Sequence, residues 1–492
     1  MNYKMIGRFL AQILAVEAVF MIPAMAISAG YGEWNTLIAF AITVGIILAV
    51  SGILQLLCRK APKALNATAG MVCVGISWIV LSLFGAIPFV LSGDISNYLD
   101  AFFETVSGFT TTGASILKDV EILSKGALYW RSFTHWLGGM GVLVFLLAIA
   151  PGSKDKGFTM HLLRAESPGP EVGKLVPRMR KTASILYIIY VVMTLINFLL
   201  LIVGDWAGWG EIHWLDALCT ALGTAGTGGF GVKNVSLADY SAYIQYVTAI
   251  FMFLFAINFS CYYLLLLGQI KSVFKDEELR LYLILVFGAI TLLALNVYGK
   301  FHDTQTVGDT IRHTTFTVST LISSTGYATT DFNAWPAFSK AIIMFLMVVG
   351  ACAGSTGGGL KISRLMYLLK SLGRNIVQVL NPRRVKLIRN NGRVVSEKVL
   401  DNTNAYLAAY VSFIVFSFVV LCFDNDFSIG TNFTAVLSCF NNMGPFLEEV
   451  GAIGGYENFS VLGKLVLSLD MLAGRLEIFP ILVLFSKGTW KK

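Results

Sequence analysis

Charged residues are scarce in this chain. Of its 492 residues, 13% are Asp, Glu, Lys or Arg, whereas soluble domains carry about 25%. So low a charged fraction excludes a soluble globular protein. The apolar residues are instead gathered in runs of about 16 to 25, long enough to cross a bilayer as helices. The runs are continuous, which favours helices over the alternating strands of a β-barrel. The predicted spans lie near residues 9–30, 36–57, 71–91, 133–150, 182–204, 243–268, 280–298, 337–372 (interrupted), 403–423 and 460–485.

Metal-binding and catalytic motifs are also missing from the sequence. The five histidines are scattered, and the seven cysteines include no CxxC pair, so neither a metal site nor a disulfide framework is indicated. The sequence contains no Walker motif, nucleophile elbow or HExxH. We therefore expect that the protein is not an enzyme and that this chain holds no organic cofactor.

The basic residues that are present concentrate in four loops, 59–63, 153–181, 271–280 and 370–398. Lys and Arg gather on the cytoplasmic side of membrane proteins, so these loops and the N-terminus are expected in the cytoplasm. The loops expected outside are 93–125, 205–240, 299–336 and 424–460. Topology thus explains the net charge of +8, and no nucleic-acid partner is expected. The long basic loops could also dock an acidic cytoplasmic protein.

The first span has two possible interpretations. Lys4 and Arg8 precede an apolar stretch that ends in Ala-Met-Ala, as in a secretory signal. However, Glu17 interrupts this stretch and a second span follows at once. We expect a retained transmembrane helix.

Each outward loop repeats one pattern. A short apolar segment of about ten residues, too short to span a bilayer, precedes a Ser/Thr/Gly cluster and then the next span. The four copies read LDAFFETVSGFTTTGAS, LDALCTALGTAGTGGFG, HTTFTVSTLISSTGYATTDF and NFTAVLSCFNNMGPFLEEVG, with glycines at Gly113, Gly228, Gly326 and Gly444. One TTTG would be only a polar turn, but four copies in matching positions indicate an internal repeat.

The repeat predicts an all-α polytopic membrane protein. Four units of span, pore helix and span would surround one pore, after two N-terminal transmembrane helices. The expected boundaries are 1–66 for the two helices, 67–152 for the first unit, 153–272 for a basic loop and the second unit, 273–380 for the third unit with a glycine-rich loop, and 381–492 for a basic loop and the fourth unit.

The clusters after the short helices are rich in oxygen ligands. Irregular backbone at membrane depth is tolerated where it lines protein or water, and carbonyl oxygens can replace the hydration shell of an alkali cation. The helices would direct their partly negative C-terminal ends at the same cavity. The predicted filter residues are Thr110, Thr111, Thr112 and Gly113; Ala225, Gly226, Thr227 and Gly228; Ser323, Ser324, Thr325 and Gly326; and Asn441, Asn442, Met443 and Gly444.

The motifs TTTGAS, TGGFG, STGY and NNMGP, in this order, resemble those of the K⁺ transporter superfamily that includes bacterial TrkH and KtrB and fungal Trk. The two additional N-terminal spans resemble TrkH-type members. The resemblance implies K⁺ uptake across the bacterial inner membrane, with K⁺ as the transported ion bound by filter carbonyls. It further implies a homodimer with one pore per subunit and a cytoplasmic nucleotide-binding regulator of the TrkA/KtrA type.

Several alternatives remain open at this point. Each segment has one glycine where tetrameric K⁺ channels carry TVGYG, so the K⁺ over Na⁺ selectivity is not fixed. A symporter coupling K⁺ to H⁺ or Na⁺ is the alternative to channel-like permeation. A membrane scaffold or sensor that recruits a cytoplasmic regulator is an alternative of another class, but it has no need of four pore loops.

The eighth predicted span is interrupted by GACAGSTGGG at residues 350–359. Each glycine costs a helix up to about 1 kcal/mol relative to alanine, so the helix should break here, either as a packing kink or as a flexible gate. Glycine-rich loops gate the proteins that this chain resembles. The predicted gate residues are Gly350, Gly354, Ser355, Thr356, Gly357, Gly358 and Gly359.

Arg475 lies inside the last apolar span. An unpaired charge at mid-membrane is costly, so this arginine should pair with Asp470 or Glu477, reach the cytoplasmic edge, or face the pore. The family resemblance implies the last of these, an electrostatic barrier to cations below the filter.

Acidic residues near the clusters are less informative. Glu448, Glu449 and Asp331 could concentrate cations at the outer mouth, or could simply belong to exposed loops. For Glu104 and Asp216, on the short helices, we expect capping or local pairing.

Overall fold

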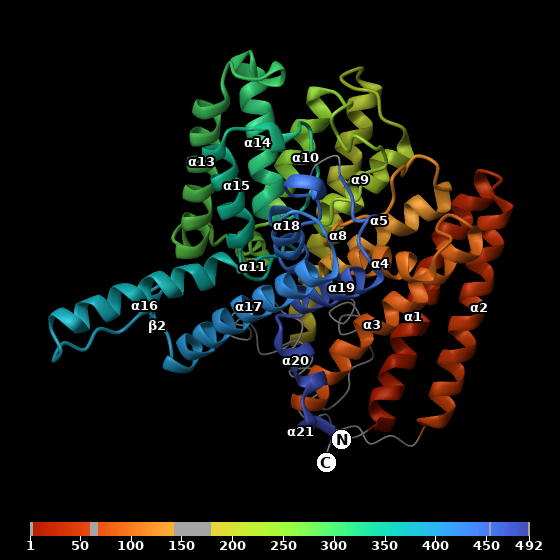
Figure 1. The fold of residues 1–492 in the computed structure, drawn as a ribbon, viewed down its shortest axis with the longest axis horizontal. Helices are drawn as coiled ribbons and strands as arrows, with labels where there is room; N and C mark the ends of the chain where they lie inside the picture. Colours follow the sequence, from red (N-terminus) through yellow and green to blue (C-terminus); the bar gives the residue numbers. More distant parts are fainter. Residues whose placement is uncertain (1–2, 60–66, 142–178, 452–453, 491–492) are drawn as a thin grey trace.

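The computed structural model describes residues 3–59, 67–141, 179–451 and 454–490. The described chain is almost entirely helical, and both termini lie at the same end of the molecule (Figure 1). The single sheet in these residues is a two-stranded antiparallel hairpin, β1 (Arg389–Asn390) with β2 (Arg393–Val394). The fold class predicted from the sequence, an all-α polytopic membrane protein, is confirmed.

The N-terminal helices and the first unit occupy one side of the molecule (Figure 1). Their helices are α1 (Tyr3–Gly30), α2 (Trp34–Leu57), α3 (Ala67–Ser92), α4 (Tyr98–Phe109) and α5 (Lys125–Gly139). The predicted span 133–150 begins within α5, and its second half lies outside the described residues, as does most of the basic loop 153–181.

The remaining three units follow in chain order. The second contains α8 (Met179–Trp206), α9 (Trp214–Gly226), α10 (Ala242–Phe255), α11 (Phe259–Leu266) and α12 (Ile270–Phe274). The third contains α13 (Glu277–Val297), η1 (His302–Thr304), α14 (Val307–Ser323), η2 (Phe332–Ala334), α15 (Ala337–Val349) and α16 (Ile362–Leu380). The fourth contains α17 (Glu397–Asp424), α18 (Ile429–Phe440), η3 (Glu448–Val450), α19 (Val461–Arg475), α20 (Phe479–Phe485) and α21 (Lys487–Trp490).

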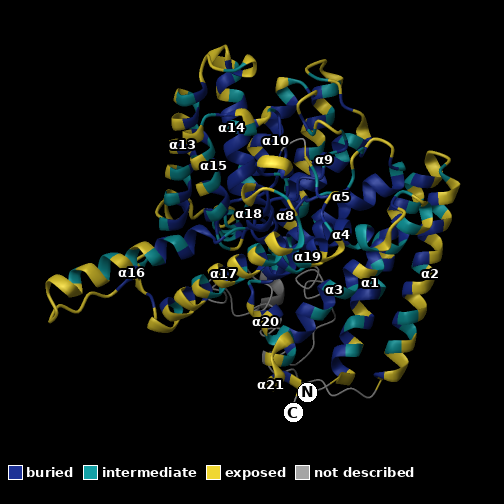
Figure 2. Cartoon of the chain, viewed as in Figure 1, coloured by how far each residue is buried: buried dark blue, intermediate teal, exposed yellow. Residues whose placement is uncertain are grey.

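Four short helices, α4, α9, α14 and α18, lie at the centre of the fold. Each begins at a polar residue whose side chain accepts a backbone N–H of the first turn, which satisfies a donor that the helix itself cannot. The capping residues are Asn97, His213, Thr306 and Ser428. The C-terminal halves of these helices are buried, and Figure 2 shows buried residues concentrated in the middle of the molecule.

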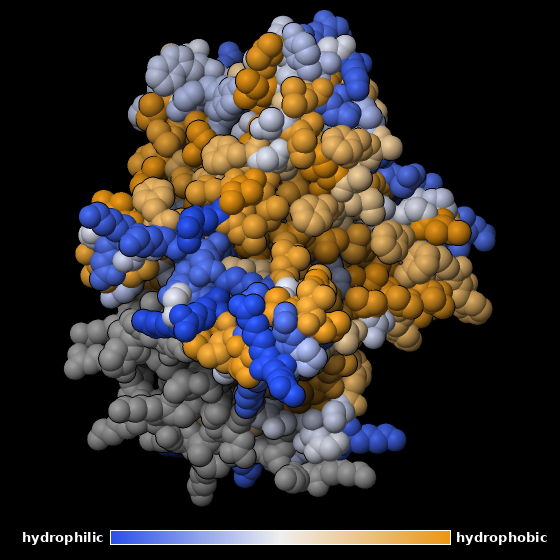
Figure 3. Space-filling model, turned by 90° about the vertical axis from the view of Figure 1, so that its left-hand side faces the viewer, coloured by the Kyte–Doolittle hydropathy of each residue, from blue (hydrophilic) through white to orange (hydrophobic). Residues whose placement is uncertain are grey.

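The surface around this centre suits a bilayer. Among the described helices, six are long and apolar enough to span a membrane, or seven if one bent pair is counted as a single span. Figure 3 shows a broad hydrophobic zone across one face, with hydrophilic residues gathered beyond it. Irregular backbone and polar side chains in the interior, with apolar side chains outside, are the arrangement expected when lipid is the solvent.

Two spans predicted as continuous are broken. Within 243–268, α10 and α11 meet at an angle of 89° around Ala256–Asn258. The Asn258 side chain accepts the Ser260 N–H, which starts a new helix there. Within 460–485, α19 ends at Arg475 and α20 starts at Phe479, because Pro480 in the first turn of α20 cannot continue the preceding helix. The predicted interruption of 337–372 is present, between Val349 and Ile362.

Candidate functional site

The four short helices end in the same backbone turn. A residue just past each helix adopts left-handed φ, at Thr111 (56°), Thr227 (55°), Ser324 (58°) and Asn442 (54°). The next residue donates its N–H to a carbonyl five positions earlier: Thr112 to Ser107, Gly228 to Gly223, Thr325 to Thr320 and Met443 to Ser438, at 2.9–3.0 Å. These C-terminal turns align the four repeats residue by residue.

This alignment corrects the predicted register of the second repeat. The glycines with positive φ two positions after the left-handed residue are Gly113 (82°), Gly229 (75°), Gly326 (91°) and Gly444 (79°). The equivalent of Gly113 is therefore Gly229, not Gly228. We call the four aligned stretches the ring segments: Thr110–Gly113, Gly226–Gly229, Ser323–Gly326 and Asn441–Gly444. The predicted filter residue Ala225 lies in helix α9, one position before its segment.

The ring segments contact one another in a closed cycle. A side chain on any of the four glycines would overlap a backbone carbonyl oxygen of the next segment. Gly113 faces the carbonyl of Gly228, Gly229 that of Thr325, Gly326 that of Met443, and Gly444 that of Thr112. Glycine is required at these positions both by positive φ and by the close approach of another backbone.

Several backbone carbonyl oxygens of the ring segments accept no hydrogen bond from the described residues. Among the hydrogen bonds of the described residues, none has as acceptor a carbonyl oxygen of the second or third position of any segment. These positions are Thr111 and Thr112, Thr227 and Gly228, Ser324 and Thr325, and Asn442 and Met443, and all eight residues are buried. Buried carbonyls nearly always have a partner, so eight of them around one ring form a ready-made set of oxygen ligands.

His135 explains why the second segment differs. Its buried ring lies between Nδ1···O of Gly108, at 2.8 Å, and the N–H of Phe230, 3.3 Å from Nε2. A side chain at Gly228 would overlap this imidazole. The imidazole from α5 thus takes the space that Thr112, Thr325 and Met443 fill in the other segments.

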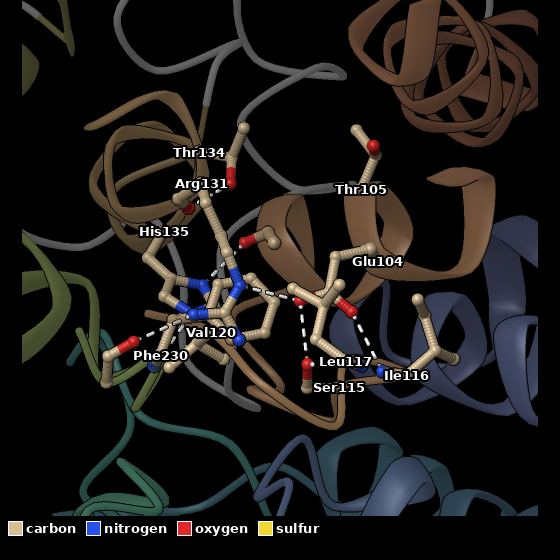
Figure 4. A network of polar contacts seen from close by, with 12 residues as sticks. Glu104, Thr105, Ser115, Ile116, Leu117, Val120, Arg131, Thr134, His135 and Phe230 are labelled. Carbon is tan, nitrogen blue, oxygen red and sulfur yellow. Dashed lines mark hydrogen bonds and ion pairs between the residues drawn. The ribbon is translucent and has the colours of Figure 1, made fainter. Parts of the chain in front are cut away.

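A buried ion pair holds the residues that follow the first and second ring segments (Figure 4). Nε of Arg131 lies 2.6 Å from Oε1 of Glu104, and both side chains are buried. Glu104 also accepts the Ser115 hydroxyl and the Ile116 N–H, both at 3.0 Å. Arg131 donates to the Gly231 carbonyl at 2.9 Å and stacks on Phe230. The local pairing expected for Glu104 is present, and its partner Arg131 was not among the predicted site residues.

The fourth segment is held by amide and hydroxyl groups. The Asn442 side chain donates to the Thr112 hydroxyl at 3.0 Å and to the Met471 carbonyl at 2.9 Å, linking the fourth segment to the first. The Tyr456 hydroxyl donates to the Gly444 carbonyl at 2.9 Å. The ring is therefore asymmetric in its side chains and fourfold in its backbone.

Residues 350–361, which we call the crossing loop, pass beneath the ring. The end of the loop returns to the end of α15 and forms a narrow neck there. The N–H groups of Leu360 and Lys361 donate to the carbonyls of Val348 and Val349, both at 3.0 Å. Next to the neck, the Gly358 N–H donates to the Ser324 hydroxyl at 2.5 Å, and the Gly359 N–H donates to the Asn441 carbonyl at 3.1 Å. The loop thus touches the third and fourth ring segments.

The crossing loop also supplies the partners that the break between α10 and α11 needs. Cys352 donates its N–H to the Ala256 carbonyl at 3.1 Å, and Gly354 accepts from the Phe259 N–H at 3.0 Å. The Thr356 hydroxyl donates to the Phe255 carbonyl at 3.2 Å. Backbone groups freed by a broken membrane helix are stable when another segment satisfies them, so the break and the loop depend on each other.

Arg475 reaches into this region from the end of α19. Its guanidinium donates to the carbonyl of Thr356 at 2.8 Å, to that of Gly139 at 2.7 Å, and to that of Gly138. The two acids considered from the sequence have other partners: Glu477 pairs with Arg364, and Asp470 accepts the Ser417 hydroxyl at 2.6 Å. Arg475 therefore bridges the crossing loop and the end of α5.

Of the outer acids, Asp331 caps η2 by accepting the Asn333 N–H at 3.0 Å, and Asp216 accepts the Tyr240 hydroxyl at 3.3 Å. Glu448 and Glu449 are exposed. An effect of these acids on cation concentration stays a prediction.

The fold and the site together define a polytopic membrane protein built as four pore-loop units around a ring of backbone carbonyls. The family model described as TrkH, cation transport protein, matches residues 37–491, and the chain belongs to this family. It is 32% identical to the Trk system potassium uptake protein TrkH of Halomonas elongata over 100% of both chains. It is 30% identical to the Trk system potassium uptake protein TrkG of Escherichia coli, covering 96% of this chain and 95% of that protein.

A solved structure agrees with this assignment. The crystal structure of the potassium transporter TrkH from Vibrio parahaemolyticus matches with a TM-score of 0.86 and 28% identity, covering 100% of both chains. The similarity therefore includes the two N-terminal helices as well as the four units.

Proposed function

We propose that this chain is the K⁺-translocating subunit of a Trk-type uptake system. The observation that carries the proposal is the closed cycle of glycine–carbonyl contacts, which holds eight carbonyl oxygens in a ring without donors from the described residues. Carbonyl oxygens in such a ring replace the hydration shell of a permeating cation. Potassium is the ion named for the relatives from Halomonas elongata and Escherichia coli.

In this proposal the ring segments form the selectivity filter and the crossing loop is the gate. The loop lies below the ring and bonds to Ser324 and Asn441 within it, so a displacement of the loop alters the passage directly. Arg475 adds a positive charge at the same level, which opposes cation flow until the crossing loop moves. Transport, with K⁺ as the carried ion and no organic cofactor on this chain, accounts for these features without catalysis.

We further propose a homodimer in the bacterial inner membrane, with the N-terminus in the cytoplasm and a nucleotide-binding regulator of the TrkA/KtrA type on the cytoplasmic face. The support is the hairpin of α16, β1, β2 and the start of α17, which extends away from the body (Figure 1). Arg383, Arg384 and Lys386 are exposed on it. Because α16 follows the crossing loop directly, a protein bound to this hairpin can act on the loop.

Flux of ⁸⁶Rb⁺ into liposomes containing the purified protein tests the proposal. We expect uptake that follows an imposed membrane potential and is competed by K⁺. Uptake that also requires a pH or Na⁺ gradient would favour a symporter over channel-like permeation. No uptake by a folded, reconstituted protein, with and without such gradients, would contradict transport and favour a scaffold.

A further inference from the structure

The guanidinium of Arg475 occupies a cradle of backbone carbonyls below the ring. Thr356 in the crossing loop supplies one carbonyl, 2.8 Å from the guanidinium, and the last two residues of α5, Gly138 and Gly139, supply the others. These are the same kind of ligand as the oxygens of the ring segments. A positively charged side chain is therefore bound as a free cation would be.

The cradle lies directly beneath the ring. A side chain on Gly138 would overlap the carbonyl of Phe109, the residue before the first ring segment, and one on Gly139 would crowd Gly226, the first residue of the second segment. The fourth ring segment contacts the first and the third, which lie opposite each other in the cycle. Arg475 belongs to the fourth unit and bonds to α5 of the first unit and to the crossing loop of the third, so its guanidinium connects the two units whose ring segments face each other.

The end of α5 favours a cation here even without Arg475. The last carbonyls of a helix have no partner within the helix and carry its partial negative charge. Gly138 also accepts the Gly141 N–H at 3.1 Å. Among the hydrogen bonds of the described residues, the Gly139 carbonyl accepts only from Arg475. When Arg475 withdraws, the Gly139 carbonyl keeps its position on a helix but loses the partner that the described residues provide.

We propose that Gly138, Gly139 and Thr356 form an inner binding site for a monovalent cation, which Arg475 fills as a tethered occupant in this state. The proposal rests on the proposed function, because it places the site on the path of the transported ion. Withdrawal of Arg475 then removes a barrier and also exposes the three carbonyl oxygens of the cradle. These oxygens bind the transported ion after the ion leaves the ring. Thr356 moves with the crossing loop, whereas Gly138 and Gly139 stay with α5.

Methylguanidinium, which has the head group of arginine without the tether, is the probe for this site. We would measure ⁸⁶Rb⁺ flux into liposomes for wild type, Arg475→Ala, Arg475→Lys and Lys361→Met, with methylguanidinium titrated against choline at constant ionic strength. Lys361→Met is the matched control, because the Lys361 ammonium binds the carbonyl of Gly357, next to the cradle but outside it. Arg475→Gln replaces Arg475→Ala if the alanine variant does not fold.

We expect methylguanidinium to inhibit flux in Arg475→Ala at least about tenfold more potently than in wild type, Arg475→Lys or Lys361→Met. We also expect it to raise the thermal unfolding temperature of Arg475→Ala in detergent, because a ligand that binds only the folded state stabilises it. Equal inhibition in all four proteins, with no such stabilisation, would overturn the inner site. Failure of every protein, wild type included, to carry ⁸⁶Rb⁺ would instead contradict the proposed function.

Discussion

Oε1 of Glu278 accepts the backbone N–H of Ala353 at 2.7 Å, so the first turn of α13 holds the crossing loop. The two preceding residues hold the cytoplasmic hairpin. Asp276 accepts the Asn391 side chain at 2.6 Å, and Glu277 accepts the Asn391 N–H at 2.9 Å and pairs with Lys370. Three consecutive acids therefore connect the hairpin that we propose as a docking site to the loop that we propose as the gate.

Replacing Glu278 should release the crossing loop. A hydrogen bond to a charged group contributes about 1.5–3 kcal/mol, and about 1.4 kcal/mol corresponds to a tenfold change in a population. We expect Glu278→Ala to raise basal ⁸⁶Rb⁺ flux by about tenfold, and Glu278→Gln, which keeps an acceptor oxygen, to raise it less. Asp309→Asn is the control, since Asp309 is also a first-turn acid but pairs with Arg312 on α14. Flux in Glu278→Ala equal to that in the control would show that the Glu278–Ala353 hydrogen bond does not hold the crossing loop closed.

Removing the tip of the crossing loop should leave the pore open. The backbones of Gly350 and Gly359 lie close together across the neck, since a side chain on either would overlap the α-carbon of the other, so we expect deletion of residues 351–358 to be closed with little movement of α15 or α16. We expect increased basal flux that no longer responds to cytoplasmic extract containing a regulator. The deletion also removes the partners of Ala256 and Phe259, so a lower unfolding temperature should accompany it. A folded deletion variant with wild-type flux would remove the gate from the proposal.

The two adjacent glycines of the second ring segment should respond differently to a compensating change. Gly228→Ala is expected to collide with the His135 imidazole, whereas Gly229→Ala is expected to collide with the Thr325 carbonyl. Adding His135→Ala makes space beside residue 228 but not beside residue 229. We therefore expect His135→Ala to restore part of the ⁸⁶Rb⁺ flux lost in Gly228→Ala and none of that lost in Gly229→Ala. Equal rescue of both would show that Gly229 is not the equivalent of Gly113.

The sequence was sufficient to locate the four ring segments, because each carries its own Ser, Thr or Asn residues and its own glycine. It was insufficient for the register of the second segment, where TGG offers two glycines. The choice between them depends on His135, a residue of α5 that is distant in sequence and touches Gly228 only in the fold. A local pattern could not contain that information.

Long-range backbone contacts explain the other differences. The break at Ala256–Asn258 is compatible with an unbroken apolar run because Cys352 and Gly354, about a hundred residues later, satisfy the freed groups. Pairing of Arg475 with nearby acids was one alternative considered from the sequence, but its observed partners are backbone carbonyls, which have no sequence signature. The sequence did mark the interruption at 350–359 through its glycines, and Pro480, in the first turn of α20, is the signal that would have marked the break within 460–485.

The Glu104–Arg131 pair provides a test of how rigid the ring must be. Removing one partner of a buried ion pair costs about 3–5 kcal/mol, because the other charge is left uncompensated. Glu104→Gln should therefore lower the unfolding temperature in detergent. It should also weaken discrimination of Rb⁺ against Na⁺ in flux competition, since Glu104 holds Ser115 and Ile116 just after the first ring segment.

The matched control for this prediction lies on the same helix. Asp100 pairs with Lys464 at 2.7 Å in a less deeply buried position, so the charge left uncompensated by its loss is less costly. Asp100→Asn should thus change both stability and ion discrimination less than Glu104→Gln. If Glu104→Gln lowers stability but leaves discrimination equal to that of Asp100→Asn, the pair supports the fold without setting the geometry of the ring. If Glu104→Gln loses discrimination of Rb⁺ against Na⁺ at temperatures where both variants are fully folded, the geometry of the carbonyl ring depends on the buried Glu104–Arg131 pair.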